Sequence, residues 1–273
     1  MAAKKKAASG ERALITGASA GIGASLAKQF AAGGFDLVLV ARSGDKLDVI
    51  AKALRSEHAV DVTVIAMDLA VVGAPKKLFD AVAKRELDVD VLVNNAGVME
   101  MAGFAVTAPE RHQQMIALNV ATLTDMLSYF MQPMIERGRG RILNVASIAA
   151  FQPVPSLATY AATKAYVLSL TEALAVELKP RGISVTALCP GLTETDMVAS
   201  ARESNSAASQ LPPFLIGDVE DVAEQGYAAC MAGEVIRVPG ALNYMATIAA
   251  RATPKWMMRA MGSMAGRFAL DKT

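Results

Sequence analysis

The sequence predicts an α/β fold built on a doubly wound parallel sheet. Short apolar runs bounded by turn residues alternate with segments of helical length, which is the order of strands and crossover helices in such a fold. The runs are rich in Val, Ile and Leu and mostly lack alternating polar residues, as do strands that are covered on both faces. The chain has 273 residues, 53% hydrophobic and 19% charged, which suits a single domain with a large core and excludes a disordered protein.

The alternation gives the following elements in chain order. The expected strands span Ala13–Thr16, Asp36–Ala41, Val62–Asp68, Val89–Asn94, Arg141–Ala146, Ser184–Cys189 and Val235–Val238. The expected helices span Ile22–Ala32, Gly44–His58, Ala74–Arg85, Pro109–Arg137, Thr159–Lys179 and Val219–Met231. Two regions depart from the alternation. Residues 196–214 are rich in Ser and Ala, and residues 241–270 have helical character after the last strand.

Composition and charge exclude several classes of protein. The net charge is +1, so a nucleic-acid partner is not expected. Cys189 and Cys230 are too few for a disulfide framework, and we expect a reducing, cytoplasmic location. His58 and His112 lie far apart in the sequence, so no metal site is expected. The basic N-terminus lacks the apolar core of a secretory signal, and no run of 18 apolar residues suits a transmembrane helix.

A glycine-rich segment lies between the first expected strand and the first helix. It runs from Thr16 to Gly23 with the sequence TGASAGIG. Glycines at this place permit a tight turn and let backbone N–H groups approach a pyrophosphate at the helix N-terminus. Because the spacing is not the common G-x-G-x-x-G, a glycine-rich helix entry without a ligand is the alternative interpretation.

The end of the second strand bears on the choice between NAD and NADP. An acidic residue about 20 positions after the glycines would bind the ribose hydroxyls of NAD, but Ala41 stands 20 residues after Gly21. Arg42 follows, and its guanidinium group suits the 2′-phosphate of NADP. We therefore favour NADP, with an ordinary surface arginine as the alternative. Asp68, which closes the third strand, is by itself a turn or cap carboxylate.

Tyr160 and Lys164 are four residues apart on an expected helix. Positions i and i+4 share one helix face, so the phenol and the ammonium group are expected to be neighbours. A nearby cation favours the phenolate and lowers the tyrosine pKa toward the range of a general acid or base. Ser147 lies 13 residues upstream at the end of a strand, on the sheet edge where ligands bind in open α/β folds. A half-buried tyrosine with a snorkelling lysine is the alternative.

Taken in order, these motifs resemble the short-chain dehydrogenase/reductase family. The set comprises TGASAGIG at 16–23, Asp68-Leu69, Asn94-Asn95-Ala96-Gly97, Asn119, Ser147, Tyr160 with Lys164, and Pro190-Gly191, Thr193 and Thr195. The resemblance implies a Rossmann fold in which residues 11–240 form the dinucleotide-binding and catalytic domain. Residues 1–10 are then a flexible arm, and residues 241–273 a helical extension of the same domain.

The resemblance also implies roles for individual residues. Tyr160 is the general acid that protonates a carbonyl oxygen, Lys164 holds the nicotinamide ribose and lowers the tyrosine pKa, and Ser147 binds the substrate oxygen. Asn119 anchors a water molecule that relays protons near the lysine. The implied cofactor contacts are Gly17, Ser19, Gly21, Ile22, Gly23, Arg42, Asp68, Leu69, Asn95, Ala96, Gly97, Tyr160, Lys164, Pro190, Gly191, Thr193 and Thr195. Ala20 stands where many NADP-dependent members carry a basic residue, so the preference for NADP depends mainly on Arg42.

The implied reaction is hydride transfer between NADP and a carbonyl/alcohol pair. We expect the substrate to be a medium or large apolar ketone or aldehyde. A catalytically silent cofactor-binding regulatory or scaffold protein is the alternative, but it has no chemical need for the intact set of Asn119, Ser147, Tyr160 and Lys164. A methyltransferase needs no Tyr-x-x-x-Lys. A homodimer or homotetramer through the helices of Asn119 and Tyr160 is implied as well.

The C-terminal extension allows two interpretations. Thr253-Pro254 is typical of a helix start, and Met257, Met261, Met264 and Phe268 then share one helix face. We favour a helix packed on its own domain over the alternative, a basic amphipathic helix with a weak contact to a membrane surface. Residues 196–210 are small and polar and are expected to form a mobile lid beside the site.

Overall fold

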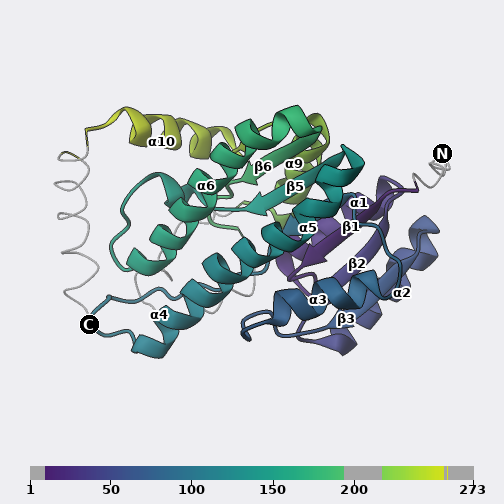
Figure 1. Ribbon diagram of the computed structural model, residues 1–273. Coiled ribbons are helices and arrows are strands. Elements are labelled where there is room, and N and C mark those ends of the chain that lie inside the picture. The colour runs from purple at the N-terminus through teal and green to yellow at the C-terminus, as the bar shows by residue number, and fades with distance from the viewer. Residues whose placement is uncertain (1–9, 194–216, 255–256, 258–273) are drawn as a thin grey trace.

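The computed structural model describes residues 10–193 and 217–254 together with Met257. Its centre is a seven-stranded sheet in the order β3-β2-β1-β4-β5-β6-β7, in which every neighbouring pair is parallel. The strands are β1 Arg12–Thr16, β2 Asp36–Ala41, β3 Val62–Ala66, β4 Val91–Asn94, β5 Gly140–Val145, β6 Ile183–Leu188 and β7 Ile236–Arg237. This confirms the predicted single-domain, doubly wound parallel sheet, with helices on both faces (Figure 1).

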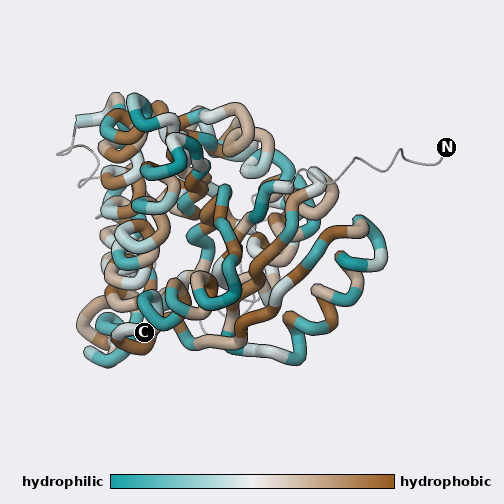
Figure 2. The backbone as a smooth tube through the Cα atoms, turned by 45° about the vertical axis from the view of Figure 1, so that its right-hand side comes forward, coloured by the Kyte–Doolittle hydropathy of each residue, from teal (hydrophilic) through white to brown (hydrophobic). Residues whose placement is uncertain are grey.

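Helices in two layers bury the apolar strands. The helices are α1 Gly21–Ala32, α2 Gly44–His58, α3 Ala74–Ala83, α4 Pro109–Ile116, α5 Leu123–Arg137, α6 Ala158–Leu178, α9 Val219–Ala232 and α10 Ala241–Ala252. Short helical turns are η1 Ala117–Thr122, η2 Ile148–Phe151 and η3 Lys179–Arg181. Side chains of α1, α2 and α9 form a core with one sheet face, and those of α3, α5 and α6 form a core with the other. Figure 2 shows that hydrophobic residues are concentrated in the central strands.

The strand order reverses beside β1. From β1 the chain first builds outward through β2 and β3, and it then returns to place β4 on the other side of β1. Such a switch point opens a crevice at the carboxyl ends of the strands, where ligands bind in folds of this kind. The glycine-rich turn after β1 lies at this edge, and so does the end of β4.

The segment predicted as one helix over Pro109–Arg137 is divided. α4 passes into a π-helical turn over Ala117–Thr122 before α5 begins. A π turn inserts an extra residue into an α-helix and is often found at functional sites. Asn119 lies within it and is 2% exposed. The helical periodicity predicted the helix correctly on both sides but not this interruption.

Several boundaries differ from the prediction by a few residues. β3 ends at Ala66 and not at Asp68, because Asp68 accepts a hydrogen bond of 3.0 Å from the Ala70 N–H in a turn. The extension expected over 241–270 is divided at Thr253, which ends α10 and donates a 2.7 Å hydrogen bond to the Ala249 carbonyl. In the described part of the chain, no helix is long and apolar enough to cross a membrane.

Four expectations lie outside the described residues. They are the N-terminal arm before residue 10, the role of Thr195, the lid over 196–210, and the apolar face formed by Met261, Met264 and Phe268.

Candidate active site

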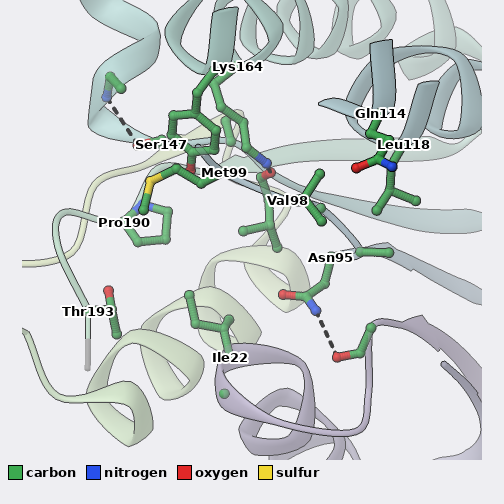
Figure 3. A pocket seen from close by; sticks show the side chains of 18 of the residues that line it. Ile22, Asn95, Val98, Met99, Gln114, Leu118, Ser147, Lys164, Pro190 and Thr193 are labelled. Atoms are coloured by element: carbon green, nitrogen blue, oxygen red, sulfur yellow. Dashed lines mark hydrogen bonds between the residues drawn. The ribbon is translucent and has the colours of Figure 1, made fainter. Parts of the chain in front are cut away.

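A cavity of about 1010 Å³ opens at the carboxyl edge of the sheet, on the predicted side. The predicted site residues that line it are Gly17, Ser19, Gly21, Ile22, Arg42, Asp68, Leu69, Asn95, Ala96, Gly97, Ser147, Tyr160, Lys164, Pro190, Gly191 and Thr193. Figure 3 shows Ser147, Lys164 and Pro190 on one side of this cavity and Ile22 and Asn95 on the other. Gly23 and Asn119 are not among the lining residues. They lie beside residues that are, Gly23 against Gly17 and Asn119 against Gly97.

The glycine-rich turn requires glycine at three of its positions. Gly17 and Gly21 have positive φ angles of 66° and 53°, a backbone region that favours glycine. A Cβ atom on Gly23 would lie 2.3 Å from the Gly17 carbonyl oxygen, so the start of α1 packs directly on the turn. This close packing places the N-terminus of α1 at the cavity, where a pyrophosphate binds in folds of this kind.

A network around Thr16 attaches this turn to the end of β4. The Thr16 hydroxyl accepts hydrogen bonds of 3.0 Å from the backbone N–H groups of Asn95 and Ala96, and it donates to the Val93 carbonyl over 3.2 Å. The Asn95 amide donates to the carbonyl oxygens of Thr16 and Gly17 over 3.0 and 3.2 Å. Figure 3 labels Asn95 at the cavity and marks one hydrogen bond of its side chain. The role of Thr16 was not predicted, because its partners lie about 80 residues away.

Tyr160 and Lys164 lie one turn apart on α6 and face the cavity together. The Lys164 Nζ atom is 5.7 Å from the centroid of the Tyr160 ring, as expected for i, i+4 neighbours. The ammonium group is 6% exposed and donates a 2.8 Å hydrogen bond to the Val145 carbonyl at the end of β5. Ser147 follows this strand and accepts a 3.1 Å hydrogen bond from the Ala149 N–H.

Burial controls the protonation of these groups. It raises the pKa of Tyr160 to about 12, and a hydrogen bond with the Ser147 side chain offsets part of this rise. Burial also lowers the pKa of Lys164 to about 8. The expectation that Lys164 brings the tyrosine pKa below its ordinary value is therefore not met here, since desolvation dominates and only the hydrogen bond with Ser147 opposes it. At neutral pH the phenol is protonated, which is the state that donates a proton.

Asn119 connects the π turn to two other segments. Its amide nitrogen donates hydrogen bonds of 2.9 Å to the Val98 carbonyl and 3.1 Å to the Thr163 hydroxyl, and its oxygen accepts one of 2.9 Å from the Val98 N–H. A Cβ on Gly97 would lie 3.1 Å from this oxygen and 3.5 Å from Lys164 Nζ. Gly97 thus lets Asn119 approach the lysine, in agreement with a position beside the catalytic set.

The residues expected on the adenosine side lie at the far end of the cavity. Arg42 is exposed at its edge, immediately after β2. Asp68 lines the cavity and also accepts the hydrogen bond from the Ala70 N–H that holds a turn. Leu69 is buried, and its carbonyl accepts a 2.6 Å hydrogen bond from Thr122 in the π turn.

The segment after β6 forms the opposite end. The Pro190 carbonyl accepts a 2.9 Å hydrogen bond from the Ile148 N–H, which fixes this segment beside Ser147. Thr193 is 3% exposed and donates to the Gly191 carbonyl over 3.1 Å. A Cβ on Gly191 would lie 2.5 Å from the Asn243 side chain of α10. α10 therefore packs directly on this wall of the cavity.

Part of the lining was not predicted. It includes an apolar set formed by Met99, Met101, Leu118, Val154, Leu157 and Leu192. Most of these residues lie in loops after β4, before α6 and after β6, where no periodic pattern indicates which side chains face inward. They line the same cavity as the predicted site residues. Among the described residues, no group of three or more His, Cys, Asp or Glu side chains could hold a metal ion.

Comparisons with known proteins agree with this geometry. Residues 11–206 match the family model of short chain dehydrogenases. The chain is 29% identical over 241 residues to a 3-oxoacyl-(acyl-carrier-protein) reductase of Aquifex aeolicus, covering 85% of this chain and 97% of the relative.

Two solved structures are similar over most of their length. The first is a short-chain dehydrogenase from Sphingobium yanoikuyae in complex with NADPH, with a TM-score of 0.78, 32% identity, and 88% of this chain and 93% of that chain covered. The second is a bulky-bulky ketone specific alcohol dehydrogenase from Comamonas testosteroni, with a TM-score of 0.75, 30% identity, and 88% and 92% covered. The fold, the cavity and these similarities together establish that the chain is an oxidoreductase of the short-chain dehydrogenase/reductase family.

Proposed function

We propose that the protein reduces medium or large apolar ketones or aldehydes to alcohols with NADPH. The observation that carries this proposal is the placement of Tyr160, Lys164 and Ser147 on one wall of a cavity that also borders the glycine-rich turn. These two features supply proton transfer and cofactor binding in a continuous space.

Each residue of the site would have a separate role in the reaction. NADPH, when bound, supplies the hydride. Tyr160 holds the proton for the carbonyl oxygen, and its high pKa keeps it protonated at neutral pH. Ser147 donates a hydrogen bond to the same oxygen as negative charge develops. Lys164 holds the nicotinamide ribose, and Asn119 fixes the π turn against α6.

Two features of the cavity support a dinucleotide with a 2′-phosphate. Gly23 has no room for a side chain, so α1 begins directly against the turn after β1, and the Thr16 network fixes this turn in place. Arg42 is exposed at the other end, without an acidic residue at position 41. A guanidinium group there would pair with the 2′-phosphate of NADP. NADPH is present in the Sphingobium yanoikuyae structure.

The apolar lining supports a large hydrophobic substrate. Methionine side chains at 99 and 101 adapt to irregular apolar shapes. Among the similar proteins, one is named for bulky-bulky ketones and another for 3-oxoacyl groups. Both names describe carbonyl compounds.

Location and assembly belong to the same proposal. Cys189 and Cys230 are free and buried, as suits a reducing cytoplasm. The helices of Asn119 and Tyr160 would form the contact of a homodimer or homotetramer, and sedimentation of the purified protein would measure this state.

A direct test follows the absorbance of NADPH during mixing with a series of ketones of increasing apolar size. We expect oxidation of NADPH with aryl and long-chain alkyl ketones and little with acetone. Turnover with NADH but not NADPH would contradict the cofactor assignment. Equal turnover across the size series would contradict the substrate class.

A further inference from the structure

His112 of α4 forms hydrogen bonds with two segments that are distant in the sequence. Its Nε2 atom lies 3.3 Å from the Phe104 carbonyl oxygen, and its Nδ1 atom lies 2.8 Å from the Thr159 hydroxyl at the start of α6. A carbonyl oxygen can only accept, so Nε2 carries the ring proton and Nδ1 of the neutral ring accepts from Thr159. The half-buried ring also stacks on Phe104, with the ring centroids 4.3 Å apart.

A loop with two methionines lies between two anchored ends. We call residues 98–104 the methionine loop, because Met99 and Met101 of this segment line the cavity. Asn119 forms two hydrogen bonds of 2.9 Å with the backbone of the first residue of the loop. His112 bonds to the last residue and stacks on its ring. The two ends of the loop are therefore fixed, one by the π turn and one by α4.

The two residues that anchor the methionine loop also hold α6 on both sides of Tyr160. Thr159, which bonds to His112, directly precedes Tyr160. Thr163, which accepts a 3.1 Å hydrogen bond from Asn119, follows one helical turn after Thr159. Positions i and i+4 share one helix face, so both connections are made from the same face of α6. Tyr160 thus lies between two connections to the methionine loop.

We propose that the hydrogen bond between His112 and Thr159 sets the width of the substrate cleft between the methionine loop and Tyr160. His112 is then a positioning residue that acts through Thr159, since neither of them is among the described residues that line the cavity. The proposal rests on the proposed function, because it takes a ketone or aldehyde to lie between the loop and Tyr160.

Loss of this bond would affect binding of the substrate more than proton transfer. Asn119 is 2% exposed and still holds α6 through Thr163, so Tyr160 keeps its place. The half-buried end of the methionine loop, at His112, would be free to move away from Tyr160. A small ketone would then lose contact with the loop, whereas a bulky ketone would still reach it.

Kinetics with ketones of increasing size test this prediction in the full-length protein. Thr159→Val removes the hydroxyl and keeps the branched shape of the side chain. We expect the KM of a small aryl ketone such as acetophenone to rise about three- to tenfold, the contribution of one neutral hydrogen bond. The KM of a bulky ketone such as benzophenone should change less. The kcat of both should stay within about twofold, because the lost contact orients the substrate and transfers no proton.

Further variants assign the effect to this one hydrogen bond. His112→Phe keeps the ring that stacks on Phe104 and should raise the KM as Thr159→Val does. The double variant should add nothing, because both single changes remove the same bond. Thr159→Ser keeps a hydroxyl and should restore the original KM. Thr124→Val is the matched control: it removes a 2.8 Å bond to Tyr166 of α6 outside the cavity and should leave the KM unchanged.

Hydrogen exchange measures the connection without catalysis. The backbone N–H groups of Val106 and Thr107 donate to the Gly103 carbonyl over 3.1 and 3.2 Å, in the turn that follows the methionine loop. In Thr159→Val these two amides should exchange at least about threefold faster, because a local contact that protects them is lost. The amides of β1, which lies in the centre of the sheet, should exchange at their original rates.

The outcomes distinguish this proposal from the proposed function. An unchanged KM for the small ketone in Thr159→Val would overturn it, and so would an equal rise for ketones of every size. A lower kcat at unchanged KM would overturn it as well, because the bond would then act on the chemistry or on the fold alone. If the unchanged protein reduces no ketone, the proposed function fails and hydrogen exchange decides: faster exchange in Thr159→Val supports the connection between the loop and α6, and unchanged exchange overturns it.

Discussion

The Asn119 amide donates a 3.1 Å hydrogen bond to the Thr163 hydroxyl, between the π turn and the helix of Tyr160 and Lys164. The same side-chain amide also accepts a hydrogen bond from the Val98 N–H and donates one to the Val98 carbonyl. Asn119 therefore joins three segments that are distant in sequence, one of which is α6. The extra residue of the π turn places it where all three bonds are made together.

We expect Asn119→Ala to reduce both stability and turnover. The change leaves the partly buried N–H and carbonyl of Val98 without partners, which costs up to about 3 kcal/mol in the free energy of unfolding. Denaturant unfolding and NADPH turnover per folded molecule measure the two effects. Asn144→Ala is a matched control, because Asn144 is fully buried and bonded to Asn94 and Thr171 away from the cavity. Its stability should fall similarly, but turnover per folded molecule should not. Equal losses of turnover would mean that Asn119 has only a structural role.

Tyr160→Phe should leave the fold and NADPH affinity intact but lower turnover by at least about a hundredfold, the usual contribution of a positioned acid or base. The phenyl ring keeps the packing and removes only the proton donor. Tyr166→Phe on the same helix removes a hydroxyl that bonds Thr124 outside the cavity, and it should keep normal turnover. Near-normal turnover of Tyr160→Phe would refute the assigned role.

The sequence predicted the parts of this structure that depend on local patterns. The bounds of β2 and α2 agree with the prediction residue for residue, because a buried strand is a continuous apolar run and an amphipathic helix repeats every 3.6 residues. The glycines of the turn and the spacing of Tyr160 and Lys164 are likewise local, and the structure places both at the same cavity.

Features that depend on distant contacts were not predicted. The π turn is held by Val98 and Thr163, 21 and 44 residues from Asn119, and no periodicity signals it. The raised pKa of Tyr160 depends on burial by the assembled walls, whereas spacing alone suggested a lowered value. The apolar face that α10 turns outward could not be recognised either. The pattern of apolar residues along a helix shows that they share one face, but it does not say whether that face meets the core.

Arg42→Ala should weaken NADPH binding and leave NADH binding nearly unchanged. The lost pairing with a 2′-phosphate is worth about 1.5–3 kcal/mol, which is roughly a 10- to 150-fold rise in Kd. Fluorescence titration with both cofactors measures this. Lys52→Ala removes an exposed cation of α2 that does not line the cavity and should alter neither affinity. Equal weakening for both cofactors would show that Arg42 does not discriminate between them.

Gly23→Ala should disrupt the turn after β1. The new methyl group would lie 2.3 Å from the Gly17 carbonyl oxygen, so the turn or α1 must move, at a cost of about 1–3 kcal/mol. We expect a lower melting temperature and weaker binding of both cofactors. In Gly217→Ala the added methyl group meets nothing closer than 3.6 Å, and this control should retain stability. Unchanged cofactor affinity in Gly23→Ala would show that the turn does not need this close packing.

Lys164 should make stability rise with pH above about 8. Burial lowers its pKa to about 8 in the folded protein, while an unfolded lysine keeps a pKa near 10.4. Between these values the unfolded chain binds more protons than the folded one, so the free energy of unfolding increases with pH in this window. Below about pH 8 both states are protonated and this contribution is constant.

The pH dependence of Lys164→Met isolates this effect. Methionine fills a similar volume without a proton, so the difference in unfolding free energy between the unchanged protein and the variant should move in favour of the unchanged protein from pH 8 to pH 10. The loss of the hydrogen bond to the Val145 carbonyl adds an offset to this difference. The offset is independent of pH in that range, because neither the introduced methionine side chain nor the carbonyl titrates.

Lys76→Met is the matched control. Lys76 is exposed and paired with Asp80, and its pKa is raised above the ordinary value by that hydrogen bond. Its removal should therefore leave the slope between pH 8 and pH 10 unchanged. A constant difference between Lys164→Met and the unchanged protein across this window would mean that the buried ammonium group keeps its ordinary pKa.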